Sequence, residues 1–215
     1  MQQRPSPNFG PRRDGLMPSI VVIHYTAMQS AEAALDRLCD PEAEVSAHYL
    51  IGCDGAVTQL VDEQQRAWHA GQGEWRGDTD VNSRSIGIEL DNAGVTPFSE
   101  PQMAALETLL ADIMLRWSIQ PHNVIGHSDM APGRKSDPGT RFDWTRLARG
   151  GLARMPTGDG SSVPSSMSPS EFRAYAVSAG YTAPVDDETL LAAVRLRYRP
   201  FSSGPLCKAD FAVLC

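Results

Sequence analysis

Two histidines stand at the ends of apolar, strand-like runs, where a rigid scaffold can present a metal ligand or a catalytic group. His24 lies near the end of SIVVIHY (19–25), and His127 ends NVIGH (123–127). An imidazole in such a run loses its hydration and needs a polar partner, and residues at strand ends often carry function. We therefore expect both side chains to serve as ligands or catalysts, with a hydrogen-bonded core histidine as the alternative.

A cation and a carboxylate follow His127 in SDMAPGRKSDPG (128–139). This segment lacks apolar periodicity and contains several Pro and Gly residues, so we expect an ordered loop. Lys135 and Asp137 are two residues apart, which in an extended loop places their side chains on the same side. Asp137 with His24 and His127 makes a donor set that suits zinc and leaves a fourth position for water. The alternative is a solvated loop with a Lys135–Asp137 ion pair.

Glu89 is a carboxylate inside another apolar run. It lies in SIGIEL (85–90), on the face opposite Ile86, Ile88 and Leu90. One interpretation is a strand residue that faces solvent. The other is a residue that lines a cleft, where loss of hydration raises the carboxyl pKa from about 4.3 toward the range of a general base.

The elements that must position these residues follow from periodicity. Short β-branched runs alternate with helical patterns, which predicts an α/β fold with a mixed central sheet flanked by helices. Asp54-Gly55 predicts a hairpin turn, and Ser99 with Gln102 predicts a capping box at a helix start. The predicted strands cover 19–25, 47–51, 56–61, 85–90 and 123–127, and the predicted helices cover 31–38 and 101–117.

A stretch rich in Gly, Pro and Ser divides the chain. Its composition, over 155–168, is typical of a linker that cannot bury a core. We therefore expect a catalytic domain over 1–154 and a small all-α domain over 169–215. A domain of this size is near the lower limit for independent folding. We therefore expect it to be stabilised by packing against the first domain or by binding a ligand.

The tail itself shows helix signals. Ser168 with Glu171 is a second capping-box pattern, and Gly180 stands where that helix should stop. A second helix is expected to end at Pro200, and a third to cover 208–214.

Composition excludes several classes of protein. Nineteen Lys and Arg against 26 Asp and Glu give a net charge of -7, so a nucleic-acid partner is not expected. No window is long and apolar enough to span a membrane. Cys39, Cys53, Cys207 and Cys215 lack a C-x-x-C pair, which favours reduced and mostly buried thiols, with a Cys207–Cys215 bridge as the alternative under oxidation.

Five segments occur in an order and spacing typical of one enzyme family. They are VVIHYTA from Val21, SAHYLIGCDGAVTQLV from Ser46, RAWHAG from Arg66, SIGIELDN from Ser85 and VIGHSDMAPGRKSDPG from Val124. Together they resemble the zinc-dependent N-acetylmuramoyl-L-alanine amidases of the amidase-2 group, over about residues 6–144. That group includes amidases of cell-wall recycling, bacteriophage endolysins and animal peptidoglycan recognition proteins.

The resemblance implies a role for each candidate residue. His24, His127 and Asp137 match the zinc ligands of the family, Glu89 its general base, and Lys135 the residue that contacts the reacting oxygen. The implied reaction is zinc-dependent hydrolysis of the amide between the lactyl group of N-acetylmuramic acid, or its 1,6-anhydro form, and L-alanine of the stem peptide. A muropeptide or peptidoglycan is then the substrate, and zinc the cofactor.

Four further residues are expected to bind substrate. Trp68 and His69 lie in a stretch that lines the substrate cleft in relatives, although Trp68 could equally belong to the core. Asn82 and Arg84 precede the Glu89 strand in a polar stretch and are candidates to bind the carboxylates of the peptide.

Other expectations concern the tail, the location and a competing function. The tail resembles small peptidoglycan-binding-like modules, with a purely structural addition as the alternative. Met1–Gly10 shows no signal peptide, which favours a cytoplasmic location, and a periplasmic or outer-membrane-anchored protein is the alternative if a leader was removed. A monomer is the expected oligomeric state. The competing function is a non-catalytic peptidoglycan-binding or muropeptide-binding protein. A stem-peptide peptidase is disfavoured because the chain lacks H-E-x-x-H.

Overall fold

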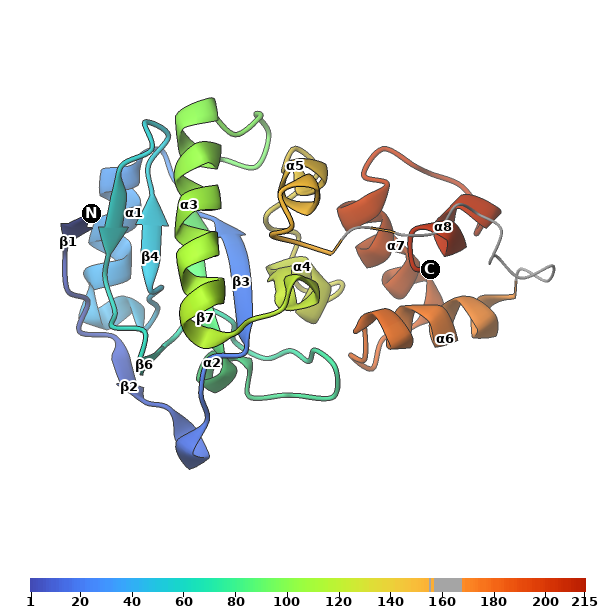
Figure 1. Cartoon of the computed structure of the whole chain (residues 1–215), viewed down its shortest axis with the longest axis horizontal. Helices are drawn as coiled ribbons and strands as arrows, with labels where there is room; N and C mark the ends of the chain where they lie inside the picture. The colour runs from blue at the N-terminus through green and yellow to red at the C-terminus, as the bar shows by residue number, and fades with distance from the viewer. Residues whose placement is uncertain (155, 157–167) are drawn as a thin grey trace.

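A six-stranded mixed sheet forms the centre of the computed structural model, which describes residues 1–154, 156 and 168–215 (Figure 1). The strands are β1 (Gln2–Gln3), β2 (Phe9–Pro11), β3 (Ile20–Tyr25), β4 (Tyr49–Ile51), β5 (Val57–Gln59), β6 (Gln65–Ala67), β7 (Ser85–Leu90) and β8 (Val124–Gly126). Their order is β1-β5-β4-β7-β3-β8, in which β4, β7, β3 and β8 run parallel and β5 is antiparallel to β4. Strands β2 and β6 form a separate antiparallel pair.

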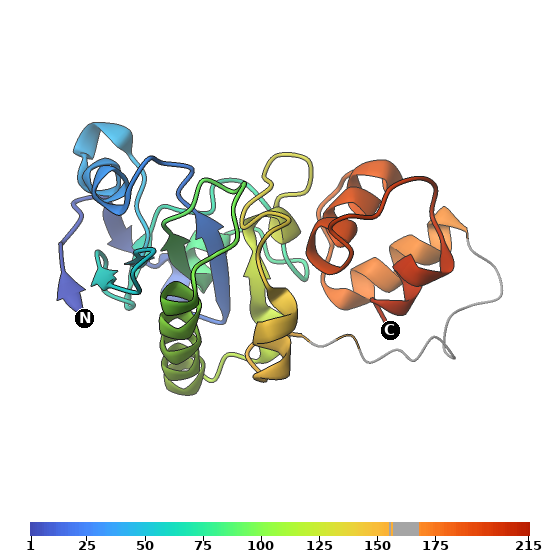
Figure 2. The ribbon, with the colours of Figure 1, turned by 90° about the horizontal axis from the view of Figure 1, so that it is seen from above.

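Helices cover both faces of this sheet. They are α1 (Ala31–Cys39), α2 (Val81–Arg84), α3 (Glu100–Trp117), α4 (His127–Met130), α5 (Trp144–Arg149), α6 (Pro169–Ala179), α7 (Asp187–Tyr198) and α8 (Lys208–Ala212), with short 3-10 turns η1 (Arg13–Gly15), η2 (Pro41–Ala43) and η3 (Pro121–Asn123). Figure 2 shows α3 and α5 on one side of the sheet and α1 on the other. The predicted fold class is confirmed.

Side-chain alternation in β3 separates the two layers. Val21 and Ile23 share a core with Leu106 and Leu110 of α3. Residues of β3 that alternate with them face the opposite side, where Val22 joins a second core. His24 lies in phase with Val22, so the strand directs its imidazole away from the α3 layer.

The predicted strands and helices are present, with ends shifted by two residues at most. The Asp54-Gly55 hairpin joins β4 and β5 as expected. The predicted Ser168 capping box is also present, with both of its hydrogen bonds formed to Glu171.

The predicted loop after His127 begins instead as a helix. Residues His127–Met130 form the single turn α4. The Asp129 carboxylate accepts the N–H of Gly126 at 2.8 Å, and Met130 is fully buried. A turn of four residues is too short to show a helical period, which is why the pattern missed it.

The predicted Ser99–Gln102 capping box forms only in part. The Ser99 hydroxyl accepts the N–H of Gln102 as expected. The Gln102 side chain, however, does not reach back to the cap. It is buried and donates to the carbonyls of Ile51, at 2.8 Å, and Asp91, at 3.2 Å. The side-chain amide of Gln102 therefore binds backbone carbonyls near the ends of β4 and β7 rather than the backbone N–H of Ser99.

The C-terminal helices pack against the sheet-bearing part of the chain, as the size of the tail led us to expect. Phe172, Tyr181 and Val194 share a core with Val22 and Trp75. The predicted linker over 155–168 falls almost entirely outside the described residues, so the proposed domain bounds stay predictions.

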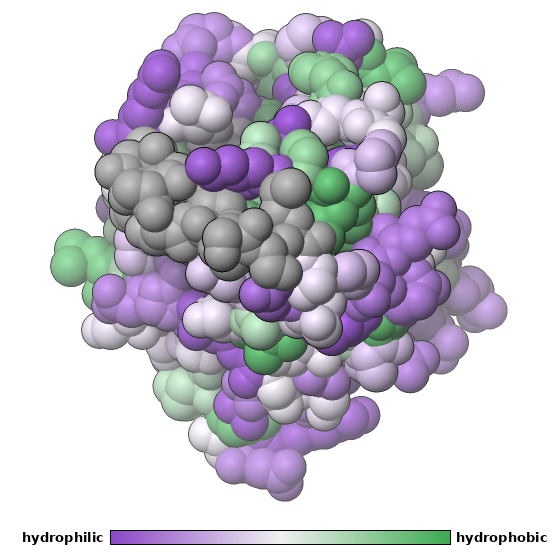
Figure 3. Space-filling model, turned by 90° about the vertical axis from the view of Figure 1, so that its right-hand side faces the viewer, coloured by the Kyte–Doolittle hydropathy of each residue, from purple (hydrophilic) through white to green (hydrophobic). Residues whose placement is uncertain are grey.

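The surface of this end of the molecule is mixed. Figure 3 shows apolar residues scattered among hydrophilic ones on the face over the C-terminal helices. None of the described helices is long and apolar enough to cross a bilayer. All four cysteines are free thiols. The expectation that most are buried is wrong, because Cys53 is exposed and the other three are half-buried.

Candidate metal centre and active site

The candidate residues meet at the carboxyl ends of β3, β7 and β8, the edge where parallel sheets commonly present their sites. His24 is the fifth residue of β3, and Glu89 of β7 is its neighbour in the sheet. His127 follows β8 directly as the first residue of α4. Asp137 returns from the loop after α4, and its carbonyl accepts the N–H of Ser128 at 3.0 Å. This contact fixes the loop against the helix that carries His127.

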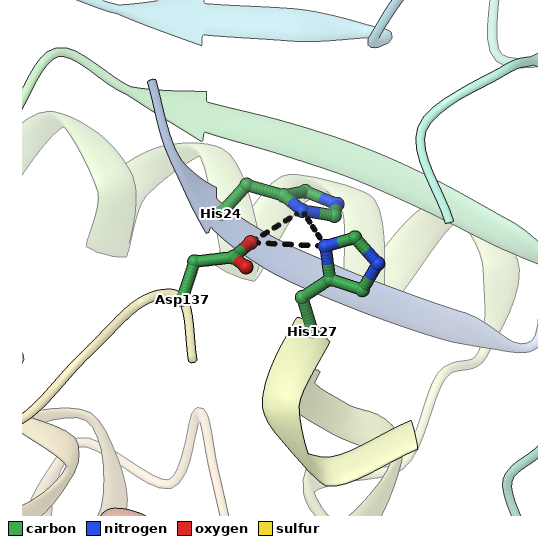
Figure 4. Close-up of side chains that lie close together, drawn as sticks. All are labelled: His24, His127 and Asp137. Carbon is green, nitrogen blue, oxygen red and sulfur yellow. Dashed lines mark hydrogen bonds and ion pairs between the residues drawn. The ribbon is translucent and has the colours of Figure 1, made fainter. Parts of the chain in front are cut away.

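Three ligand-type atoms converge at this edge (Figure 4). Nδ1 of His24 lies 2.8 Å from Oδ2 of Asp137 and 3.0 Å from Nδ1 of His127, and that nitrogen is 3.0 Å from the same oxygen. All three residues are buried. Atoms held by a tetrahedral zinc ion at 2.0–2.1 Å are about 3.3 Å apart. The spacing is therefore close to that required for binding one shared ion.

The electrostatics favour the ligand forms of these groups. Burial is the main cause that lowers the pKa of His24 to about 4, so its imidazole is neutral at pH 7. Burial alone would raise the pKa of Asp137, but the two imidazoles outweigh it and keep the pKa below its usual range. Neutral imidazole and carboxylate are the forms that bind a divalent metal. The group could thus hold a metal ion.

Glu89 lies in the same cavity, which has a volume of about 450 Å³ and is also lined by Lys135. Its Oε2 is buried and has no hydrogen-bond partner among the described residues. Burial, with the negative charge of Asp137, raises the pKa of Glu89 to about 8, although Lys135 acts in the opposite direction. The structure thus places Glu89 in a cavity rather than on an open solvent-facing strand surface.

Lys135 is exposed and lines the cavity, on the same loop as Asp137. No ion pair joins these two side chains in the part of the chain that the structure describes, and the Asp137 oxygen instead faces the two imidazoles. The ammonium group is therefore free to meet a ligand in the cavity.

The four residues expected to bind substrate separate into two pairs. Trp68 and His69 are half-buried and line the cavity. Asn82 and Arg84 are absent from the cavity lining. Arg84 instead forms an ion pair with Asp78 at 3.1 Å. The proposed contacts of these four residues with substrate stay predictions.

Asn82 has a different role within the chain. It is buried, and its Oδ1 accepts the N–H groups of His69, at 3.0 Å, and Ala70, at 2.9 Å. Asn82 therefore fixes the backbone of the segment that carries His69.

Two cavity-lining arginines were not predicted from the sequence. Arg37, from α1, is exposed and lines the cavity. Arg134 also lines it and donates to the carbonyls of Ala70, at 2.8 Å, and Gln72. Arg134 directly precedes Lys135, a position that could have drawn attention to it, whereas Arg37 lies in no motif and reaches the cavity only through tertiary packing.

Comparisons with known proteins show which enzymes this chain resembles in sequence. The family profile described as N-acetylmuramoyl-L-alanine amidase matches residues 14–140. The N-acetylmuramoyl-L-alanine amidase AmiD of Escherichia coli is 42% identical over 153 residues, which cover 64% of this chain and 54% of that protein. The 1,6-anhydro-N-acetylmuramyl-L-alanine amidase AmpD of Enterobacter cloacae is 35% identical over 160 residues, which cover 66% of this chain and 86% of that protein.

Solved structures extend the likeness to nearly the whole chain. The complex of E. coli AmiD with anhydro-N-acetylmuramic acid-L-Ala-D-gamma-Glu-L-Lys has a TM-score of 0.81 at 32% identity and covers 98% of this chain and 90% of that one. AmpDH3 from Pseudomonas aeruginosa with anhydromuramic pentapeptide has a TM-score of 0.81 at 30% identity, with coverage of 98% and 93%. The sequence motifs, the fold and the family profile lead to one assignment. The chain belongs to the N-acetylmuramoyl-L-alanine amidase family.

Proposed function

We propose that this protein is a zinc-dependent amidase that hydrolyses the bond between the lactyl group of a muramic acid and L-alanine of the stem peptide. The observation that carries the proposal is the convergence of the His24, His127 and Asp137 donor atoms within 3.0 Å beside Glu89 and Lys135. Two imidazoles and one carboxylate, with an open position toward the cavity, are typical of catalytic zinc.

The substrate class comes from the structural neighbours. AmiD and AmpDH3 were solved with an anhydromuramic tripeptide and an anhydromuramic pentapeptide, respectively. We infer that muropeptides of this kind are substrates here, and that the protein acts in peptidoglycan turnover or recycling.

Each polar residue of the cavity has a chemical task in this proposal. When bound, zinc would polarise the scissile carbonyl and increase the acidity of water. A cation held by the adjacent donors would favour the carboxylate form of Glu89 over the protonated form that its pKa of about 8 implies. The carboxylate then accepts a proton from the attacking water at its unpartnered Oε2 and returns it to the leaving nitrogen of L-alanine. The Lys135 ammonium stabilises the negative charge that develops on the carbonyl oxygen.

The cavity walls also suit a muropeptide. Arg37 and Lys135 are exposed cations, and a stem peptide carries carboxylates that such cations attract. Trp68 offers an aromatic surface to the sugar or to the peptide.

Product analysis tests the proposal. The full chain, with zinc and with a chelator, is incubated with defined anhydro and non-anhydro muropeptides, and the products are identified by mass spectrometry. We expect release of the intact stem peptide, loss of activity with chelator and recovery on zinc addition. Asp137→Asn serves as a variant with a weakened metal site. Binding of muropeptide without release of peptide would instead identify a binding protein.

The expected cytoplasmic location and monomeric state remain part of this proposal. Cell fractionation and light scattering of the purified chain test them directly.

A further inference from the structure

The second ring nitrogen of His127 shows which tautomer this ligand adopts. Its Nε2 lies 2.8 Å from the carbonyl oxygen of Ala70. A carbonyl oxygen can only accept, so Nε2 carries the hydrogen. A neutral imidazole has one N–H, and Nδ1 of His127 therefore presents a bare lone pair to Asp137 and to any shared ion.

The tautomer of His24 is set by a longer chain of hydrogen bonds. The hydroxyl of Ser85 lies 2.6 Å from the carbonyl oxygen of Val81, which can only accept. Its single hydrogen is thereby used, so the Ser85 oxygen must accept from Nε2–H of His69, at 3.1 Å. Nδ1 of His69 then accepts from Nε2–H of His24, at 3.0 Å.

When the three donor atoms share a cation, this row of hydrogen bonds has one consistent direction. Because His24 donates from Nε2, its Nδ1 is left without a hydrogen, and Nδ1 is the atom that faces Asp137 and His127. A His69 ring protonated at Nδ1 would leave its bare Nε2 facing the Ser85 oxygen, and its Nδ1–H would point at the Nε2–H of His24.

The surroundings of His69 are built to receive its ring. A Cβ placed on Gly87 would lie 2.4 Å from Cγ of His69, so the strand has room for the imidazole only because residue 87 lacks a side chain. Asn82 fixes the backbone N–H groups of His69 and Ala70. Ser85 and Val81, which end this row of hydrogen bonds, are fully buried. Residues 69–70 therefore contact both ligand imidazoles, His24 through the ring of His69 and His127 through the carbonyl of Ala70.

We propose that His69 is a positioning residue that fixes the tautomer and ring orientation of His24, so that Nδ1 of His24 is presented to the metal. The inference rests on the proposed metal site, because three acceptor atoms within 3.0 Å of one another need a shared cation. Both ring nitrogens of His69 already have partners in the chain, so any contact of His69 with substrate would involve its carbon edge or face. Partners of this kind orient metal ligands in many proteins.

The first test measures the tautomers directly. Long-range proton–nitrogen correlation spectra are recorded on the zinc-loaded full chain labelled with ¹⁵N-histidine at pH 7.5, with His24 and His69 assigned from the variants His24→Gln and His69→Asn. We expect both rings in the Nε2–H form. A His69 ring protonated at Nδ1, or zinc bound through Nε2 of His24, would overturn the proposal.

The second test measures zinc affinity by competition with a chromophoric chelator. His69→Leu removes the acceptor, and we expect a loss of about 10- to 100-fold. His69→Asn keeps an acceptor near the position of Nδ1 and should recover part of that loss. Ser85→Ala, which removes the far partner of His69, should weaken zinc binding in the same direction. His122→Asn, on the 3-10 turn η3, is the matched control and should leave the affinity unchanged.

The outcomes separate this inference from the proposed function. If the wild-type chain does not bind zinc, the proposed function fails. If it binds zinc, but His69→Leu binds equally well and His24 keeps its tautomer, only the role of His69 is wrong. Should His69→Leu not fold, the spectra of the wild-type chain still decide.

Discussion

The Asp129 carboxylate and the Arg197 guanidinium form an ion pair at 2.5 Å, with side-chain exposures of 1% and 3%. Asp129 belongs to α4, the turn that begins with the candidate ligand His127, and Arg197 belongs to α7. Asp129 also accepts from the hydroxyl of Tyr181 at 2.7 Å. The C-terminal helices are therefore joined to the active-site region through fully desolvated charges.

Arg197→Ala should destabilise the whole chain. The change leaves the Asp129 carboxylate buried without its cation, which typically costs about 3–5 kcal/mol of unfolding free energy. It also removes the guanidinium that lies 3.9 Å from the centre of the Trp144 ring. Urea unfolding measures the effect, with Arg149→Ala on the exposed end of α5 as the control. Equal stability of the two variants would contradict the assigned role.

Lys135→Ala should reduce turnover and leave zinc content unchanged. Its ammonium is exposed in the cavity and is not one of the three converging donors. Loss of one electrostatic donor to a developing oxyanion costs about 10²- to 10³-fold in rate. Steady-state kinetics and metal analysis of the same preparation check this, and Lys135→Arg should retain part of the activity. Near-wild-type turnover in Lys135→Ala would rule the role out.

Glu89→Gln should also reduce turnover while zinc remains bound. The amide has the shape of the carboxyl but cannot take a proton, and acid–base catalysis commonly contributes about 10²- to 10⁴-fold. The two measurements are the rate of peptide release and the zinc-to-protein ratio. A parallel loss of zinc and activity would show that Glu89 acts on the metal site instead.

Arg37→Ala should raise KM and leave kcat nearly unchanged. Arg37 is exposed on α1 and lines the cavity, and an exposed charge pair contributes about 0.2–1 kcal/mol. The expected rise in KM is thus a few-fold, and it should shrink at high salt. Muropeptides with free carboxylates and with amidated ones give the comparison. An unchanged KM for both would exclude a contact with the peptide carboxylates.

Asp210→Asn should lower stability at neutral pH more than at acidic pH. Burial of Asp210 would raise its pKa, but hydrogen bonds from Arg195 and Arg199 outweigh this and lower the pKa from 3.8 to about 2. A carboxyl whose pKa is lower in the folded state stabilises the protein above its unfolded pKa. That contribution is lost as the pH falls from about 4 to 2. Urea unfolding of both proteins at pH 7 and pH 3 measures the difference, which should be smaller at pH 3.

The residues that the sequence located well are those fixed by local pattern. Alternation in 85–90 placed Glu89 on the face away from the core, and the structure has it beside His24 on that face. The three donors lie at the ends of two buried strands and on a loop with fixed turns, so the parallel sheet brings them to one edge. Periodicity and family motifs were sufficient for this much.

The remaining features depend on contacts between distant segments. Asn82 was expected to face substrate, but the turn α2 directs its side chain to the amides of His69 and Ala70. Arg37 enters the cavity because α1 packs beside it, and no short motif marks such a position. The Asp129–Arg197 pair joins residues 68 positions apart, a distance at which pattern reasoning gives no information.

The position of β3 between β7 and β8 affects when the site can form. Both flanking strands come later in the chain, and His24 and His127 are 103 positions apart. A nascent chain must therefore close long loops, which carries an entropic cost and slows folding, before the two imidazoles can meet. Zinc that binds only the folded site would stabilise the native state by mass action, but it would not start folding. Added zinc should then slow unfolding more than it speeds refolding.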